Sequence, residues 1–112
     1  MSTASIVTGY SLTLTGKSGT QYTFTLYSGM PEFNSIGGVY VFTKAATVGG
    51  SHTVIYIGMT SDLSTRFDNH HKMPCIQKNG ANFLGVLTIN EESRRRNAEN
   101  DLLAAYTPTC NG

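Results

Sequence analysis

The chain has 112 residues and a formal net charge of +1. This length favours one domain with a single modest core, and the ordinary apolar content argues against a disordered chain. A charge so close to zero argues against a free-standing, non-specific nucleic-acid binder, which is usually more basic. Because we find neither a signal peptide nor an apolar run of about 20 residues, we expect a cytoplasmic protein without a membrane span.

Residues 6–27 alternate between apolar and polar side chains, with a glycine-containing break at residues 16–19. In the second half, Tyr22, Phe24 and Leu26 fall on one face and threonines on the other. This period of two predicts a half-buried β-hairpin. A lone hairpin is only marginally stable in water, so we expect it to extend the main sheet. The alternative is that its edge serves a partner or a substrate.

Two apolar runs, residues 38–42 and 53–58, follow with a glycine-rich connection between them. Their β-branched and aromatic content predicts a second antiparallel hairpin. The runs contain Tyr40 and Tyr56, whose hydroxyl groups must find hydrogen-bond partners or face solvent. These two tyrosines are therefore candidate functional residues.

Asp62 to His71 is predicted to form a short helix that Pro74 ends, with Leu63 and Phe67 facing the core. Residues 76–82 are polar and are predicted to form a loop.

Residues 83–89 are almost continuously apolar, which predicts a strand buried on both faces. Asn90 is expected to cap a helix that runs to about Tyr106. These strands and helices together predict an α+β fold. Residues 1–35 form a hairpin extension, and residues 36–112 form one compact domain.

Three charged or titratable residues of the predicted helices suggest chemistry. The guanidinium of Arg66 has a planar set of donors suited to phosphate, and His70 lies one helical turn later. An isolated arginine or histidine more often belongs to a solvated helix face, and it is the position of these two residues relative to the two tyrosines that favours a functional role. Glu99 lies beside the apolar stripe of its helix, where a carboxylate needs a donor, a metal ion or an arginine such as Arg95.

The two tyrosines lie in the tripeptides Gly38-Val39-Tyr40 and Tyr56-Ile57-Gly58, and further polar residues follow in order: Arg66, His70, Glu99 and Asn111. This pattern, spread over residues 37–111, resembles that of the GIY-YIG nuclease family. The resemblance implies a small antiparallel sheet with flanking helices, and hydrolysis of DNA phosphodiester bonds with a divalent metal ion.

The resemblance also implies roles for the residues. Tyr40 would activate or orient the attacking water. Glu99 would bind Mg²⁺ or Mn²⁺, and Arg66 would stabilise the charge of the transition state.

The remaining matches would assist these three residues. Tyr56 and His70 would hold the phosphate or assist proton transfer, and Asn111 would orient Glu99 or the backbone near it. A role for Asn111 requires that the neighbouring Cys110 anchor this segment.

DNA is the expected partner, and its binding would depend on a local basic patch: Lys44, Lys72, Lys78, Arg94, Arg95 and Arg96. The arginine triplet could equally be a solvated helix face. Because the net charge is small, we expect a homo-oligomer or a separate DNA-binding protein to assist. The substrate, whether a repair or recombination intermediate or a specific site, stays open. The alternatives are an inactive binding module and a structural protein that self-associates through the N-terminal hairpin.

Cys75 and Cys110 are too few for a disulfide framework, so we expect two reduced thiols. The less favoured alternative is a zinc site that also uses His70 and His71.

Overall fold

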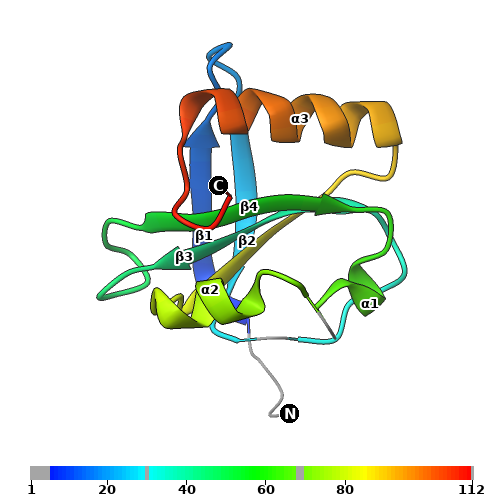
Figure 1. Ribbon diagram of the computed structural model, residues 1–112. Helices are drawn as coiled ribbons and strands as arrows, with labels where there is room; N and C mark the ends of the chain where they lie inside the picture. The colour runs from blue at the N-terminus through cyan, green and yellow to red at the C-terminus, as the bar shows by residue number, and fades with distance from the viewer. Residues whose placement is uncertain (1–5, 30, 68–69, 112) are drawn as a thin grey trace.

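The computed structural model describes residues 6–29, 31–67 and 70–111, and the side chains from residue 10 onwards. Five antiparallel strands form one sheet in the order β1-β2-β5-β3-β4 (Figure 1). The strands are β1 (Ile6–Thr15), β2 (Gln21–Tyr27), β3 (Gly38–Lys44), β4 (Thr53–Thr60) and β5 (Phe83–Thr88). The helices are α1 (Leu63–Arg66), α2 (Met73–Lys78) and α3 (Glu92–Ala105). The predicted α+β class and the antiparallel sheet are confirmed.

The N-terminal hairpin extends the main sheet, as expected. β1 pairs with β2, and β2 continues the sheet by pairing with β5, so that Leu26 lies opposite Gly85. The alternation holds in the burial pattern, because Phe24 and Leu26 are buried while the threonines between and beside them are exposed. Register in this hairpin therefore follows from which face is apolar.

β3 and β5 occupy the interior of the sheet, and each has paired neighbours on both sides. β5 contributes Leu84 and Val86 to one face and Leu87 to the other, which confirms the prediction of a strand buried on both faces. The β3–β4 hairpin is also confirmed, with Tyr40 opposite Gly58 and Phe42 opposite Tyr56.

α3 lies on one side of the sheet, and α1 and α2 lie on the other (Figure 1), and each face carries its own apolar cluster. One face packs against α3 through Ala98 and Leu102, over Val39, Val41 and Ile57. The other face packs against the segment containing α1 and α2, where the cluster includes Tyr40, Phe42, Tyr56, Leu63 and Ile76. Alternation along β3 sends Tyr40 toward α1 and α2, and Val39 and Val41 toward α3.

The predicted helix from Asp62 to His71 was too long. Asp62 caps α1 by accepting a hydrogen bond from the Ser64 amide, but α1 ends at Arg66. Residues 68–69 lie outside the described residues. A second helix, α2, includes Pro74, where the predicted helix was expected to end. It also includes part of residues 76–82, which were predicted to form a loop. Pro74 lies in the first turn of α2, where proline loses no helical hydrogen bond, so it begins a helix instead of ending one.

Asn90 does not cap α3; the cap position is Glu91, and its side chain makes no capping hydrogen bond. The carbonyl groups of Ile89 and Asn90 instead accept hydrogen bonds from Nη1 of Arg95, at 3.2 and 2.7 Å. The guanidinium fits there because Gly37 has no side chain, and a Cβ at Gly37 would lie 2.2 Å from Nη1. Arg95 therefore joins the start of α3 to the residues that follow β5.

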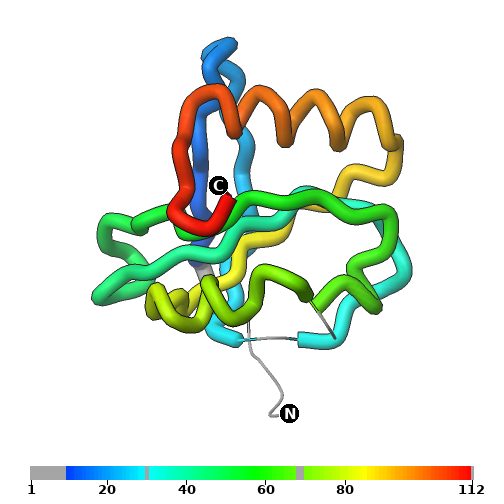
Figure 2. Tube along the Cα trace, in the orientation of Figure 1, coloured from blue at the N-terminus to red at the C-terminus, as the bar shows by residue number. Residues whose placement is uncertain are grey.

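The expectation of two reduced cysteines was wrong, because Cys75 and Cys110 form a disulfide bond. The bond joins α2 to the segment that follows α3, which returns to β4 (Figure 2). Thirty-five positions separate the two cysteines, and only the tertiary fold brings them together. Within the described residues, we find no helix that combines the length and hydropathy needed for a membrane span.

Replacing Arg95 with alanine should lower the free energy of unfolding by about 2–4 kcal/mol, because two charge-assisted hydrogen bonds to the carbonyl groups of Ile89 and Asn90 are lost together with the packing of a buried side chain. Urea denaturation of Arg95→Ala against wild type measures this difference. Arg94→Ala is the matched control, since Arg94 is exposed, and it should change stability by no more than about 0.5 kcal/mol. Equal effects of the two substitutions would contradict the anchoring role of Arg95.

Candidate functional site

Tyr40 lies at the centre of an aromatic cluster on the α1–α2 side of the sheet. Its side chain is fully buried, at 0% exposure. The Tyr40 ring centroid lies 5.0 Å from that of Phe67, edge to face, and 6.1 Å from that of Tyr56. Phe67 was predicted only as a core residue, and it forms one wall around the phenol.

Gly58 makes the space that the two tyrosine rings occupy. A Cβ built on Gly58 would lie 2.6 Å from the hydroxyl oxygen of Tyr40 and 2.8 Å from Cε2 of Tyr56. Real Cβ atoms essentially never approach other atoms so closely. The final glycine of the Tyr56-Ile57-Gly58 tripeptide is thus explained by steric contact with both tyrosines.

Arg66 and His70 both reach the hydroxyl oxygen of Tyr40. Nε of Arg66 donates to it at 2.8 Å, and Nε2 of His70 lies 2.7 Å from it. The two residues were predicted to share one helical stripe. They converge on Tyr40 all the same, although α1 ends at Arg66 and His70 precedes α2.

The backbone of Lys72 fixes which nitrogen of His70 carries the proton. Its amide donates to Nδ1 of His70 at 3.0 Å, so Nδ1 must be unprotonated. The hydrogen of neutral His70 is then on Nε2, which donates to Tyr40. The oxygen of Tyr40 therefore accepts two hydrogen bonds, from Arg66 and His70. Sequence inspection missed this contribution because a backbone amide has no residue-type signal.

Burial and charge act in opposite directions on these groups. Burial raises the pKa of Tyr40 well above its ordinary value, while the hydrogen bond and charge of Arg66 act to lower it. Burial lowers the pKa of His70 to about 4, and the positive charges of Arg66 and His71 lower it further. At neutral pH, Tyr40 is therefore protonated and His70 is uncharged.

Tyr56 completes the cluster from β4. It is buried, and its ring centroid lies 5.0 Å from that of His70 in an edge-to-face contact. Its hydroxyl group contributes to the raised pKa of Tyr40 through a hydrogen bond and through charge.

Glu99 comes from α3, on the opposite layer, and is half-buried. Burial raises the pKa of its carboxyl group, and the charges of Arg96 and Arg66 oppose that rise. Glu99 is thus electrostatically coupled to Arg66, although no hydrogen bond or ion pair to its carboxylate occurs among the described residues. Arg95 does not pair with it, because that guanidinium binds backbone carbonyls.

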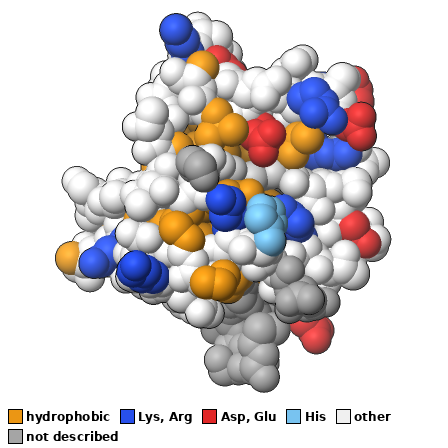
Figure 3. All heavy atoms as spheres, viewed as in Figure 1, with side chains coloured by type: hydrophobic (Ala, Val, Ile, Leu, Met, Phe, Trp, Pro, Cys, Tyr) orange, Lys and Arg blue, Asp and Glu red, His pale blue; other side chains and the backbone are white. Residues whose placement is uncertain are grey.

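Figure 3 shows the face of the molecule with α3 above, β4 across the middle and α2 below. Lys or Arg and His side chains gather near the centre of this face, and an Asp or Glu side chain lies above them toward α3. Positive and negative side chains therefore share this face of the molecule, on which β4, an edge strand of the sheet, lies between α3 and α2.

Asn111 binds the backbone of β4. Its Oδ1 accepts from the amide of Ile57 at 2.9 Å, and its Nδ2 donates to the carbonyl of Ile57 at 2.8 Å. The predicted role of Asn111, to orient Glu99 or the backbone near it, stays a prediction. The contact is with the central residue of the Tyr56-Ile57-Gly58 tripeptide.

The predicted basic patch is divided among separate elements. Lys44 and Lys78 are exposed at the ends of β3 and α2, and Arg94 and Arg96 are exposed on α3. Nη2 of Arg96 lies 3.9 Å from a carboxylate oxygen of Glu92, one turn away. The remaining two members differ in exposure, since Lys72 is half-buried and Arg95 is buried at 5% exposure.

A zinc site at the cysteines is contradicted, because both sulfur atoms are in the disulfide. Among the described residues, no three Asp, Glu, His or Cys side chains lie close enough to hold a metal ion together. Glu99 is the carboxylate among the six residues of the predicted site.

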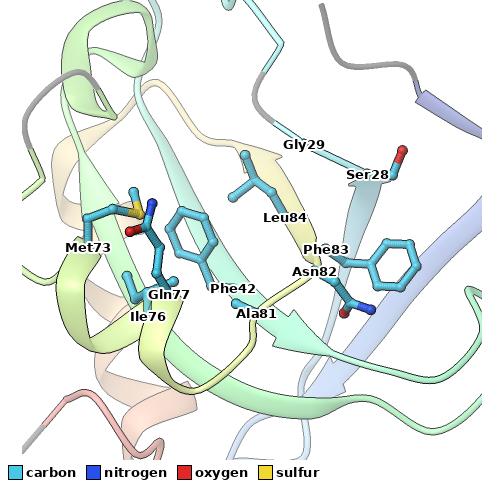
Figure 4. Close-up of a pocket in the computed structure, with 10 residues that line it drawn as sticks. All are labelled: Ser28, Gly29, Phe42, Met73, Ile76, Gln77, Ala81, Asn82, Phe83 and Leu84. Carbon is cyan, nitrogen blue, oxygen red and sulfur yellow. The ribbon is translucent and has the colours of Figure 1, made fainter. Parts of the chain in front are cut away.

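A separate apolar pocket of about 210 Å³ lies between α2 and the sheet (Figure 4). Phe42, Met73, Ile76 and Leu84 line it, with Gln77 and Asn82 as polar neighbours. None of the six residues of the predicted site lines this pocket, and the Asn82 side chain is engaged with the backbone of Ala45.

Comparison with known proteins assigns no family to this chain. A scan of protein-family models, a search of curated proteins and a search of solved structures each found no match. The resemblance to GIY-YIG nucleases stays a prediction, and any function must be argued from the geometry.

Replacing Gly58 with alanine should displace the Tyr40 and Tyr56 rings and destabilise the fold by about 1–3 kcal/mol, as overpacking does in a close-packed core. Near-ultraviolet circular dichroism of the tyrosines and urea denaturation would measure the two effects. An unchanged tyrosine signal together with wild-type stability would contradict the steric role of Gly58.

The pKa of His70 predicts loss of stability in mild acid. His70 titrates near 4 when folded and near 6.5 when unfolded, so the unfolded chain binds more protons between these values. The contribution of His70 is present above pH 6.5 and is lost as the pH falls toward 4. Thermal unfolding at pH 7 and pH 4.5 should show a larger fall in Tm for wild type than for His70→Gln. Equal falls would contradict this linkage.

Proposed function

We propose that this chain is a metal-dependent DNA endonuclease with a GIY-YIG-like catalytic core. The observation that supports this most strongly is the convergence of Arg66 and His70 on the hydroxyl oxygen of Tyr40. An ordinary core tyrosine needs one partner for its hydroxyl group. Two donors on one phenol oxygen favour the build-up of negative charge on that oxygen.

Tyr40 is proposed to orient and activate the water that attacks the phosphodiester bond. Burial holds its pKa high in the free protein, while Arg66 and the Nε2–H group of His70 stabilise its oxygen as the proton leaves. Neutral His70 acts here as a hydrogen-bond donor. Because its pKa is lowered, His70 is a weak proton acceptor at neutral pH.

Arg66 has a second proposed task. Its Nε–H group is committed to Tyr40, and the guanidinium has further N–H groups on its two terminal nitrogens. These are the groups that would contact a phosphate oxygen and stabilise the extra negative charge of the transition state. Arg66 would thus couple the position of Tyr40 to that of the phosphate.

The donor set at Glu99 fits Mg²⁺ or Mn²⁺. Mg²⁺ usually keeps several waters and is held by one or two carboxylates together with substrate phosphates, so one carboxylate suffices. Glu99 is half-buried and has no ion-pair partner among the described residues. Glu99 would hold the ion, which when bound supplies positive charge for the leaving oxygen.

DNA would be bound through cations of several elements, namely the exposed Lys44, Lys78, Arg94 and Arg96 and the half-buried Lys72. Arg95 is left out of this proposed set because its guanidinium is buried. Each phosphate contact adds a salt-sensitive attraction without sequence preference. With a net charge of +1, tight binding requires a second copy of the chain or a DNA-binding partner.

One observation favours a second function, a binding module without catalysis. Tyr40 is fully buried and its pKa is raised, so in the free protein no water reaches the phenol and it holds its proton. Such a network would then serve only to fix the face that contacts nucleic acid.

Nicking of supercoiled plasmid with Mg²⁺ or Mn²⁺ tests the proposed activity. Glu99→Gln should reduce the rate at least about 100-fold, because the carboxylate that holds the ion is lost. EDTA should abolish nicking. Glu92→Gln is the matched control, since Glu92 is an exposed glutamate on the same helix, and it should cleave like wild type.

Cleavage that survives in Glu99→Gln would contradict the assignment of the metal ligand. Absence of cleavage on supercoiled, branched and single-stranded DNA, combined with salt-sensitive binding of the same substrates, would replace the nuclease by the binding module.

A further inference from the structure

The segment after α3 closes the outer edge of β4. The amide of Cys110 donates to the carbonyl of Ile55 at 2.9 Å, and the side chain of Asn111 makes both of its hydrogen bonds with Ile57. An open strand edge would leave these outward-facing backbone groups to water or to another chain. This segment thus holds β4 on both sides of Tyr56.

The other end of the disulfide leads to His70. Cys75 lies in the first turn of α2, and the amide of Met73 donates to the carbonyl of His70 at 3.0 Å. The Lys72 amide, which sets the tautomer of His70, directly precedes this helix. The side-chain amide of Asn79, at the end of α2, lies 3.6 Å from both sulfur atoms.

We propose that Cys75, Cys110 and Asn111 are positioning residues that hold the Tyr56 strand and the His70 segment together, and that a dithiol reductant releases this connection. The disulfide joins α2 to the segment that follows α3. In that segment, Asn111 is hydrogen-bonded to the backbone of Ile57, between Tyr56 and Gly58. The sequence expectation of two independent thiols excluded any such link.

The release is an ordinary thiol–disulfide exchange. A thiolate of the dithiol attacks one of the two sulfurs and forms a mixed disulfide while the other cysteine leaves as a thiolate. The second thiol of the reductant displaces the first cysteine and closes a cyclic disulfide. Two electrons and two protons pass to the protein, which gains two thiols, and the dithiol is oxidised.

The consequence for catalysis rests on the proposed function. The ring centroids of Tyr56 and His70 lie 5.0 Å apart. If these two residues serve a nuclease site, reduction of the disulfide should loosen their contact and lower the cleavage rate. The structural part of the inference is independent of catalysis and needs its own measurement.

Hydrogen–deuterium exchange resolved by NMR provides that measurement on the full chain. After reduction with dithiothreitol, confirmed by a mass gain of two hydrogens, the Ile57 amide should exchange faster. Asn111→Ala should accelerate the same amide on the order of tenfold with the disulfide intact, because its acceptor is gone. Thr109→Ala, an exposed change in the same segment, should leave the amide unchanged.

Val41 provides the internal reference, since β3 lies between β4 and β5. Acceleration confined to amides of β4 supports a local tie, whereas equal acceleration at Val41, the β3 residue opposite Ile57, would mean that reduction destabilises the sheet as a whole and would overturn the proposal. The ring of His70 gives the positioning readout. Its NMR titration should move upward from about 4 in Cys75→Ser/Cys110→Ser, as water gains access. An unchanged pKa of His70 in this double variant would also overturn the proposal. If these shifts occur without any nuclease activity, the tie stands and the proposed function fails.

Discussion

The buried hydroxyl group of Tyr40 is the constraint on which the site depends. A phenol removed from water needs polar partners, and Arg66 and His70 supply them across 2.8 and 2.7 Å. To reach the hydroxyl, α1 must lie against β3 and the His70 segment must fold back over Tyr56. Gly58 must lack a side chain so that both tyrosine rings fit. One buried oxygen thus sets requirements on α1, the His70 segment and β4.

The sheet divides the proposed chemistry between two layers. Tyr40, Tyr56, Arg66 and His70 belong to the α1–α2 side, whereas Glu99 belongs to α3 on the other side. The positive charge of Arg66 nevertheless opposes the rise in the pKa of Glu99, and β4 is an edge strand of the sheet. A site at a strand edge has open backbone groups, and the segment containing Asn111 satisfies those of Ile55 and Ile57.

Local patterns predicted most of the fold. The alternation in residues 6–27 predicted the N-terminal hairpin, and the apolar run at 83–89 predicted a central strand. Both predictions succeed because the periodicity and burial of a strand depend on side chains that are close together in the sequence. Errors arose where a distant group decided the outcome. Asn90 was predicted to cap α3, but its carbonyl group accepts a hydrogen bond from Arg95 and the cap residue is Glu91. Pro74 was predicted to end a helix, but it lies in the first turn of α2, whose Ile76 packs into the core.

The sequence by itself determined the sheet-forming segments, and its motif pattern named Arg66 and His70 as candidates before the structure placed them at Tyr40. It could not show that Cys75 and Cys110 meet, that Arg95 turns inward, or that a Lys72 amide selects the His70 tautomer. These features depend on contacts between segments far apart in the chain or on backbone groups that every residue shares. Only the tertiary structure decides them, because residue type alone does not specify a distant partner.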